Sequence, residues 1–425
     1  MTHATVCAES ICRSYHYRLA RIYLATVKHR NVVGAQLMLR ISVMKRQMTG
    51  TINRIMRGVF ASLLFAMASF SAQAAETTAL EQSYPELQQL LLAHDVVQAR
   101  AYEEISITNS SPTAAIGQRV LLDTLQELEE TKGSHYHSAG DHSAMLGPHR
   151  VFESRAIPGL LGVIREDHNA QTVRTALADV GNLPPVAVEA LQRGRQFVEQ
   201  LIEIYLNPVF EDKKLAVSQA VAAYLEDDQH SVAFKPKSDE LLSDHDYAYA
   251  YKAGFPQLSG LTWASQWLKI ALLEILVTAP DAESRDEDIT QLLNLYGEKI
   301  TRLHGSLVSL PSDIPTNPVI APNFYTFHPD AAYILDNLEL LKVVIGDILA
   351  HPEVEDRWPE IEKAVADYTD KNSQLTKESD YLLYVLRGGI YNAGGPARGG
   401  LNRPDRNWTR EQTENPHIST SPMAQ

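Results

Sequence analysis

Apolar residues recur at intervals of three and four along most of the chain after residue 75, as on one face of an α-helix. The clearest stripe lies between Pro329 and His351. Its members are Ile334, Leu338, Leu341, Ile345 and Ile348. Proline is common at the first position of a helix, and Pro352 follows the stripe, so this pattern predicts a helix with both limits marked.

Other helices are predicted from their start signals. Helical stripes follow Ser111-Pro112 and Pro184-Pro185, and a third follows the capping-box pair Ser284 and Glu287. Few segments alternate in the manner of a strand, and the best of them, residues 246–251, also fits a helix. The predicted fold class is therefore all-α, a multi-helix globular bundle of one large domain or two helical subdomains.

The polar segment 229–240 contains Pro236 and has no apolar period, so it is the predicted linker between the two subdomains. The N-terminal subdomain would span residues 75–228 and the C-terminal subdomain residues 241–395. Residues 396–425 are predicted to be a disordered tail, because they hold too little apolar content to offset the entropy of ordering.

Residues 44–74 have the layout of a secretory signal peptide. Basic residues precede an apolar run from Val59 to Phe70, and the small-residue site Ala72-Gln73-Ala74 follows it. The run is too short to span a bilayer as a stable helix. The chain is therefore predicted to be exported, to the periplasm or outside the cell, and residues 1–43 are interpreted as an over-extended start.

The composition after the leader excludes several classes of function. Both cysteines, Cys7 and Cys12, precede it, so the exported part has no disulfide, thiolate metal site, thiol nucleophile or c-type haem. Ten of the 38 Lys and Arg residues but only one of the 52 acidic residues lie before Glu76. The rest of the chain therefore has a net charge near −23. That charge disfavours nucleic acid and anionic lipid. No later apolar stretch is long enough for membrane insertion.

Histidines gather in the segment that follows the first long helix. The metal-ligand candidates there are His135, His137, Asp141, His142 and His149. Imidazole is the commonest metal ligand, and without thiols a zinc, copper or iron site has to combine histidine with carboxylates. Glu153 lies one helical turn after His149, and His168 is a further candidate.

This pattern supports a transition-metal site. In a hydrolytic form Glu153 or Glu166 would act as the general base on a metal-bound water, whereas an iron or copper site would carry out redox chemistry instead. The alternative is a solvated polar loop that binds nothing, since no established zinc or di-iron motif is present. No nucleotide-binding motif and no serine-nucleophile motif is found either. The glycines around Arg387-Gly388-Gly389 indicate either an anion site or the end of a helix.

A second hypothesis is a pocket for a small organic ligand, walled by aromatic residues and containing no metal. Its candidate residues are Tyr247, Tyr249, Tyr251, Trp263, Trp267, Phe324 and Tyr325. Trp263 and Trp267 also have the spacing of a core stripe, and packing is the simpler explanation for them. A purely structural helical protein is the third alternative, and the oligomeric state is not indicated.

Overall fold

The computed structural model describes residues 78–130, 147–301, 311 and 313–398. This part of the chain contains sixteen α-helices, one 3-10 helix and no strand, which confirms the all-α prediction. The predicted upstream extension, the predicted signal peptide and residues 399–425 lie outside it. Among the described helices, none combines the length and apolar content needed to cross a membrane.

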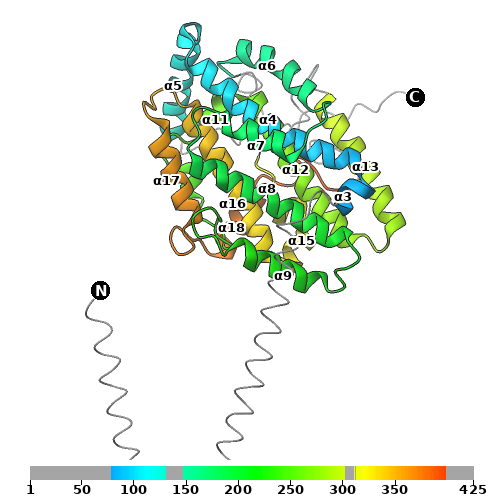
Figure 1. Cartoon of the computed structure of the whole chain (residues 1–425). Coiled ribbons are helices and arrows are strands. Elements are labelled where there is room, and N and C mark those ends of the chain that lie inside the picture. Colours follow the sequence, from blue (N-terminus) through cyan, green and yellow to red (C-terminus); the bar gives the residue numbers. More distant parts are fainter. Residues whose placement is uncertain (1–77, 131–146, 302–310, 312, 399–425) are drawn as a thin grey trace, which may run out of the picture. The chain divides into compact units, whose positions relative to one another are not determined.

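Four long helices form the centre of the body (Figure 1). They are α4 (Pro85–Asn109), α8 (Pro185–Leu206), α12 (Pro256–Thr278) and α16 (Pro329–Ala350). Both α12 and α16 pack against α4 and α8. Every residue of α12 from Leu258 to Leu276 is buried, because this helix is apolar around most of its circumference and is enclosed by neighbours.

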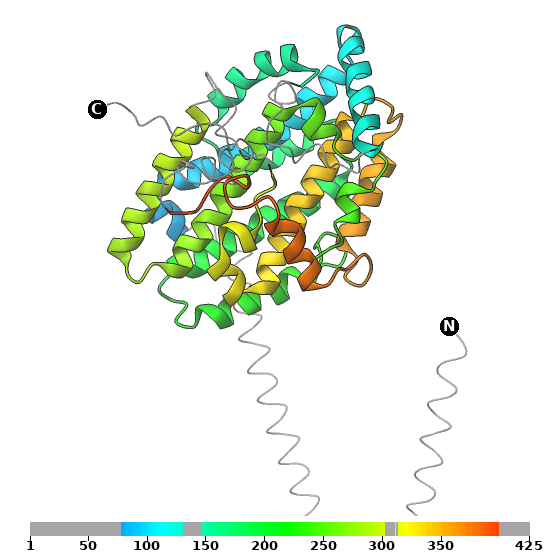
Figure 2. The same ribbon diagram turned by 180° about the vertical axis from the view of Figure 1, so that it is seen from behind.

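The remaining helices surround this centre. On the N-terminal side these are α3 (Ala79–Ser83), η2 (Pro112–Ala114), α5 (Ala115–Glu130), α6 (Arg150–Val163), α7 (Ala170–Ala178) and α9 (Lys213–Tyr224). The others are α10 (Glu240–Ser243), α11 (Ala250–Gly254), α13 (Ala282–Thr301), α14 (Asn317–Ile320), α15 (Pro322–Phe327), α17 (Arg357–Thr369) and α18 (Glu378–Leu386). Seen from behind, α18 leads into the C-terminal segment that crosses the body (Figure 2).

The predicted helix starts are right at Pro185 and Pro329, shifted at Pro112, where the 3-10 helix η2 precedes α5, and wrong at the capping box. Helices α8 and α16 begin at Pro185 and Pro329 as expected. Helix α13 instead begins at Ala282, and the carboxylate of Asp281 accepts the N–H of Ser284 at 2.8 Å. Aspartate is as good a cap as serine, so the earlier acidic residue takes this position.

Four helices are capped by carboxylates from distant parts of the chain. None of the four has a cap bond from its own N-cap side chain, which leaves N–H groups of the first turn without a local partner. Glu153 caps α12, Glu274 caps α15, Asp336 caps α14 and Asp347 caps α11. We call these four the distant caps. Each of these hydrogen bonds joins the first turn of one helix to a side chain of another helix.

The predicted linker segment 229–240 is packed against α16 and α17. The ammonium of Lys237 donates to the carbonyls of Asp367, Asp370 and Ser373 at 2.6, 2.5 and 2.9 Å, at the C-terminal end of α17. A cation is favoured there by the orphan carbonyls of the helix end. One apolar cluster contains buried residues from Leu80 to Ala397. The division into two subdomains stays a prediction.

Buried histidine makes stability sensitive to acid. Burial first, and then the charge of Lys269, lower the pKa of His94 to about 3, so the ring stays neutral in the fold. Its contribution to stability is complete above the unfolded pKa of about 6.5 and is lost as pH falls through the folded value. We expect the melting temperature of the parent to fall further between pH 6.5 and 4 than that of a His94→Gln variant. Parallel melting curves in thermal denaturation would contradict this expectation.

Candidate functional site

His149 and Glu153 lie on the first turn of α6 and face the start of α12. His149 is the N-cap residue of α6, and its carbonyl accepts the N–H of Glu153 at 3.1 Å. The imidazole stacks on Phe255, with ring centroids 4.7 Å apart and 20° between planes. Glu153 Oε1 accepts the N–H groups of Gln257 and Leu258 at 2.8 and 3.0 Å. Both side chains are 1% exposed.

Three polar atoms of this pair have no hydrogen-bond partner among the described residues. They are the two ring nitrogens of His149 and Oε2 of Glu153. A buried polar atom without a partner costs about 1–3 kcal/mol, so native proteins rarely leave several of them together. Such a group of polar atoms is a candidate position for a ligand atom, a proton or a water molecule.

Burial sets the charge state of both groups. It lowers the pKa of His149 to about 4, so the ring is neutral at physiological pH. Burial also raises the pKa of Glu153 to about 8, although the two backbone N–H bonds oppose this change. Neutral imidazole is the form that binds metal. A cation beside Glu153 would favour its carboxylate form.

Helix α5 closes one side of the His149 ring. A Cβ atom added at Gly117 would lie 2.8 Å from Nδ1 of His149, closer than real side chains approach. The position therefore accepts glycine alone without a shift of the ring. With Nδ1 covered by this contact, Nε2 is the better placed nitrogen for a ligand.

The structure does not bring His168 or Glu166 to this pair. Nε2 of His168 lies 2.8 Å from the carbonyl oxygen of Val163, beyond the far end of α6. Fourteen residues of helix separate the two histidines, or about 20 Å. Glu166 is exposed at the same far end.

The other candidate ligands, His135, His137, Asp141 and His142, lie outside the described residues. Within the described ranges, no group of three or more histidine, aspartate or glutamate side chains is placed to hold a metal. The His149–Glu153 pair is thus the described part of the predicted site.

No protein-family model, curated protein or solved structure matches this chain. Besides the histidine–glutamate pair, the described residues form a cavity between α12, α16 and α18.

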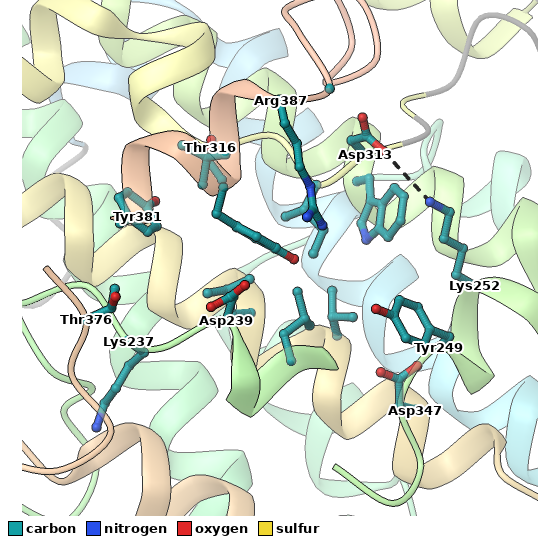
Figure 3. A pocket seen from close by; sticks show the side chains of 18 residues that line it. Lys237, Asp239, Tyr249, Lys252, Asp313, Thr316, Asp347, Thr376, Tyr381 and Arg387 are labelled. Carbon is teal, nitrogen blue, oxygen red and sulfur yellow. Dashed lines mark ion pairs between the residues drawn. The ribbon is translucent and has the colours of Figure 1, made fainter. Parts of the chain in front are cut away.

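This cavity has a volume of about 100 Å³. Its lining combines apolar residues of α16 with aromatic residues of α12 and α18, and with charged residues from several segments (Figure 3). Arg387 and Tyr249 point into it, whereas the ammonium of Lys237 points away (Figure 3).

Only two of the seven residues predicted for an aromatic pocket, Tyr249 and Trp263, line this cavity. Tyr251, Trp267 and Phe324 are fully buried in the core. Tyr325 is hydrogen-bonded to Tyr333 at 2.8 Å, and Tyr247 packs on His351 with ring centroids 5.3 Å apart. The sequence did not predict that the carboxylates of Asp239, Asp313 and Asp347 line a common cavity, because no local pattern shows which distant residues lie together.

The glycine-rich segment after α18 presents carbonyls, the opposite of what an anion site requires. The ammonium of Lys299 donates to Gly394 O at 2.6 Å, and the indole N–H of Trp267 donates to Gly395 O at 2.7 Å. A Cβ atom at Gly394 would lie 2.7 Å from the Trp267 ring, and the residue has φ +111°. The glycines therefore allow close backbone packing on α12 and α13.

Proposed function

We propose that this is an exported helical protein that binds a transition metal through His149, Glu153 and the histidine-rich segment 135–142. The observation that carries the proposal is the buried pair on one turn of α6, in which three polar atoms lack a partner among the described residues. The acidic character of the exported part supports a cationic ligand over an anionic one.

The donor set favours zinc, copper or iron. Nε2 of His149 and Oε2 of Glu153 would supply one nitrogen and one oxygen ligand, and imidazole with carboxylate is a common combination for these ions. Further ligands would come from His135, His137, Asp141 and His142. In an enzymatic form, such a metal would lower the pKa of a bound water and support hydrolysis, whereas iron or copper would support redox chemistry.

Within that proposal Glu153 is a ligand and a helix cap at once. Its Oε1 is committed to the start of α12, and only Oε2 is left for a cation. Glu166 is no candidate base for this centre, because it lies at the other end of α6. The ring of His149 is oriented by Phe255, which keeps the imidazole at the first turn of α12.

The test is metal content by mass spectrometry on protein purified without a histidine tag. We expect close to one equivalent in the parent and at least a tenfold loss in both His149→Phe and Glu153→Gln. Phenylalanine retains the stack on Phe255, and glutamine retains an oxygen acceptor for Gln257 and Leu258. His168→Gln is the matched control and should retain the metal.

The pH dependence gives a second readout. Since Glu153 must lose its proton to bind a cation, the apparent affinity should rise with pH up to about 8 and level off above it. The Glu153→Gln variant should not show this rise. Metal retained at parental level in both variants, or a folded parent that binds no metal at all, would overturn the proposal.

A further inference from the structure

The cavity beside α18 has walls suited to an apolar group. Leu340 and Val343 of α16 contribute aliphatic surface, and Trp263 of α12 with Tyr381 and Tyr384 of α18 contribute aromatic surface. Ligand sites typically combine such walls with a few polar groups that fix orientation. The walls alone would bind an uncharged hydrocarbon group of modest size.

Unpartnered polar atoms line the interior of the same cavity. Nε1 of Trp263, Oγ1 of Thr316 and Oδ2 of Asp313 are buried and have no hydrogen-bond partner among the described residues. Trp263 is 3% exposed and Thr316 is 4% exposed. One donor, one hydroxyl and one carboxylate oxygen are thus buried without a partner, as expected where a polar ligand belongs.

Charges of opposite sign stand at the mouth of the cavity. Arg387 and Asp239 are exposed residues that approach it from opposite sides (Figure 3). Guanidinium is the preferred partner of a carboxylate, and a carboxylate pairs with an ammonium. The arrangement therefore suits a ligand that has both charges at one end.

A purely cationic ligand fits less well, because side chains of the protein already cover two aromatic faces. The ammonium of Lys252 lies 5.2 Å from the centroid of Trp263, and the guanidinium carbon of Arg387 lies 4.4 Å from that of Tyr384. A purely anionic ligand is opposed by the carboxylates of Asp239, Asp313 and Asp347. Both arguments favour a ligand with no net charge.

The backbone at the cavity is held in an uncommon conformation. Tyr249 has φ +68°, in the left-handed region that a bulky side chain rarely adopts. Asp347 holds the turn, since its Oδ1 accepts the N–H of Tyr251 at 2.8 Å and its Oδ2 lies 3.4 Å from Nε2 of His245. Strained backbone conformations are common at ligand sites, where they fix the direction of a side chain that contacts the ligand.

The size of the cavity narrows the choice. At about 30 Å³ for each water, 100 Å³ holds about three waters, which is room for the apolar side chain of a small ligand whose charged end stays at the mouth. We propose that the cavity binds a free α-amino acid with an aromatic or branched aliphatic side chain. The side chain would lie against Trp263 and α16, the carboxylate at Arg387 and the ammonium at Asp239.

The experiment is isothermal titration calorimetry with L-phenylalanine and L-leucine. Two analogues of phenylalanine are compared, 3-phenylpropionate without the ammonium and 2-phenylethylamine without the carboxylate. We expect saturable binding of at least one of the two amino acids. Both phenylalanine analogues should bind at least tenfold more weakly than L-phenylalanine. If leucine alone binds, its analogues 4-methylpentanoate and isoamylamine should bind at least tenfold more weakly than L-leucine. Absence of saturable binding at millimolar concentration, or an analogue that binds as tightly as its amino acid, would overturn the proposal.

Substitutions then locate the site. Arg387→Gln and Asp239→Asn should each weaken binding at least tenfold, and Trp263→Phe should weaken it severalfold because part of the aromatic wall is lost. Arg174→Gln on α7 and Asp123→Asn on α5 make the same charge changes at exposed positions away from the cavity and should bind as the parent does. Binding unchanged in Arg387→Gln would place the ligand elsewhere and defeat the assignment, whatever the result of the metal analysis.

Discussion

Replacement of Lys269 by methionine will lower the free energy of unfolding by about 3–5 kcal/mol, because it leaves a carboxylate buried without its partner. The ammonium of Lys269 lies 2.8 Å from Oδ1 of Asp95, and the two side chains are 9% and 15% exposed. Burial acts to raise the pKa of Asp95, but the charges of Lys269 and Lys342 outweigh it and hold that pKa below its ordinary value. Urea denaturation at pH 7 measures the loss.

Two further variants separate the buried charge from lost packing. The double variant Lys269→Met/Asp95→Asn should recover much of the loss, since no unpaired charge remains inside. The control Lys363→Met breaks an ion pair with Asp367 whose N–O distance, 3.0 Å, is similar to that of the buried pair. Because the side chain of Lys363 is 73% exposed, this substitution should lower the free energy of unfolding by less than about 1 kcal/mol. If Lys269→Met proved no more costly than Lys363→Met, the pair would not carry the stability assigned to it.

The second large effect is expected at Glu153. Glu153→Ala should cost about 2–4 kcal/mol, because it removes the acceptor of two buried N–H groups at the start of α12 and leaves a void. Glu153→Gln retains an oxygen in the same place and should cost less than about 1 kcal/mol in metal-free protein. Urea denaturation of both variants in the presence of a chelator isolates the cap from the metal site.

The pH profile of these variants checks the same assignment. The pKa of Glu153 in the fold, about 8, lies above its value in the unfolded chain. The protonated side chain therefore contributes fully to stability below about pH 4.5, and this contribution is lost as pH rises through 8. Stability of the parent should therefore fall relative to Glu153→Gln over that interval. Equal costs for alanine and glutamine, with no difference in pH profile, would contradict a capping role.

Helix positions could be predicted from the sequence because local rules determine them. Apolar spacing and proline at the first position located α8 and α16, since a helix needs one apolar face and tolerates proline only at its start. The cap of α12 could not be predicted, because Glu153 and Gln257 are 104 residues apart. The same applies to the pair of Asp95 and Lys269, which are 174 residues apart.

The candidate site was predictable only over the length of one helical turn. The spacing of His149 and Glu153 indicated a shared face, and the structure places both at the first turn of α12. Aromatic density between residues 247 and 267 did not indicate which rings share a cavity. Tyr249 itself adopts the left-handed backbone conformation and lines the cavity, whereas Tyr251, two residues later, is buried in the core. That turn depends on Asp347, a residue of another helix.

The distant caps bear on the order in which the molecule can assemble. Asp347 accepts the N–H group of Tyr251, which lies 96 residues earlier in the chain. Asp336 accepts the N–H group of Asn317, which lies 19 residues earlier. A chain that emerges from its N-terminus thus exposes the starts of α11 and α14 before their acceptors exist. Those two helix starts stay frayed until α16 arrives. Their completion is therefore a late event, and a chain that ends before α16 has no route to the native packing.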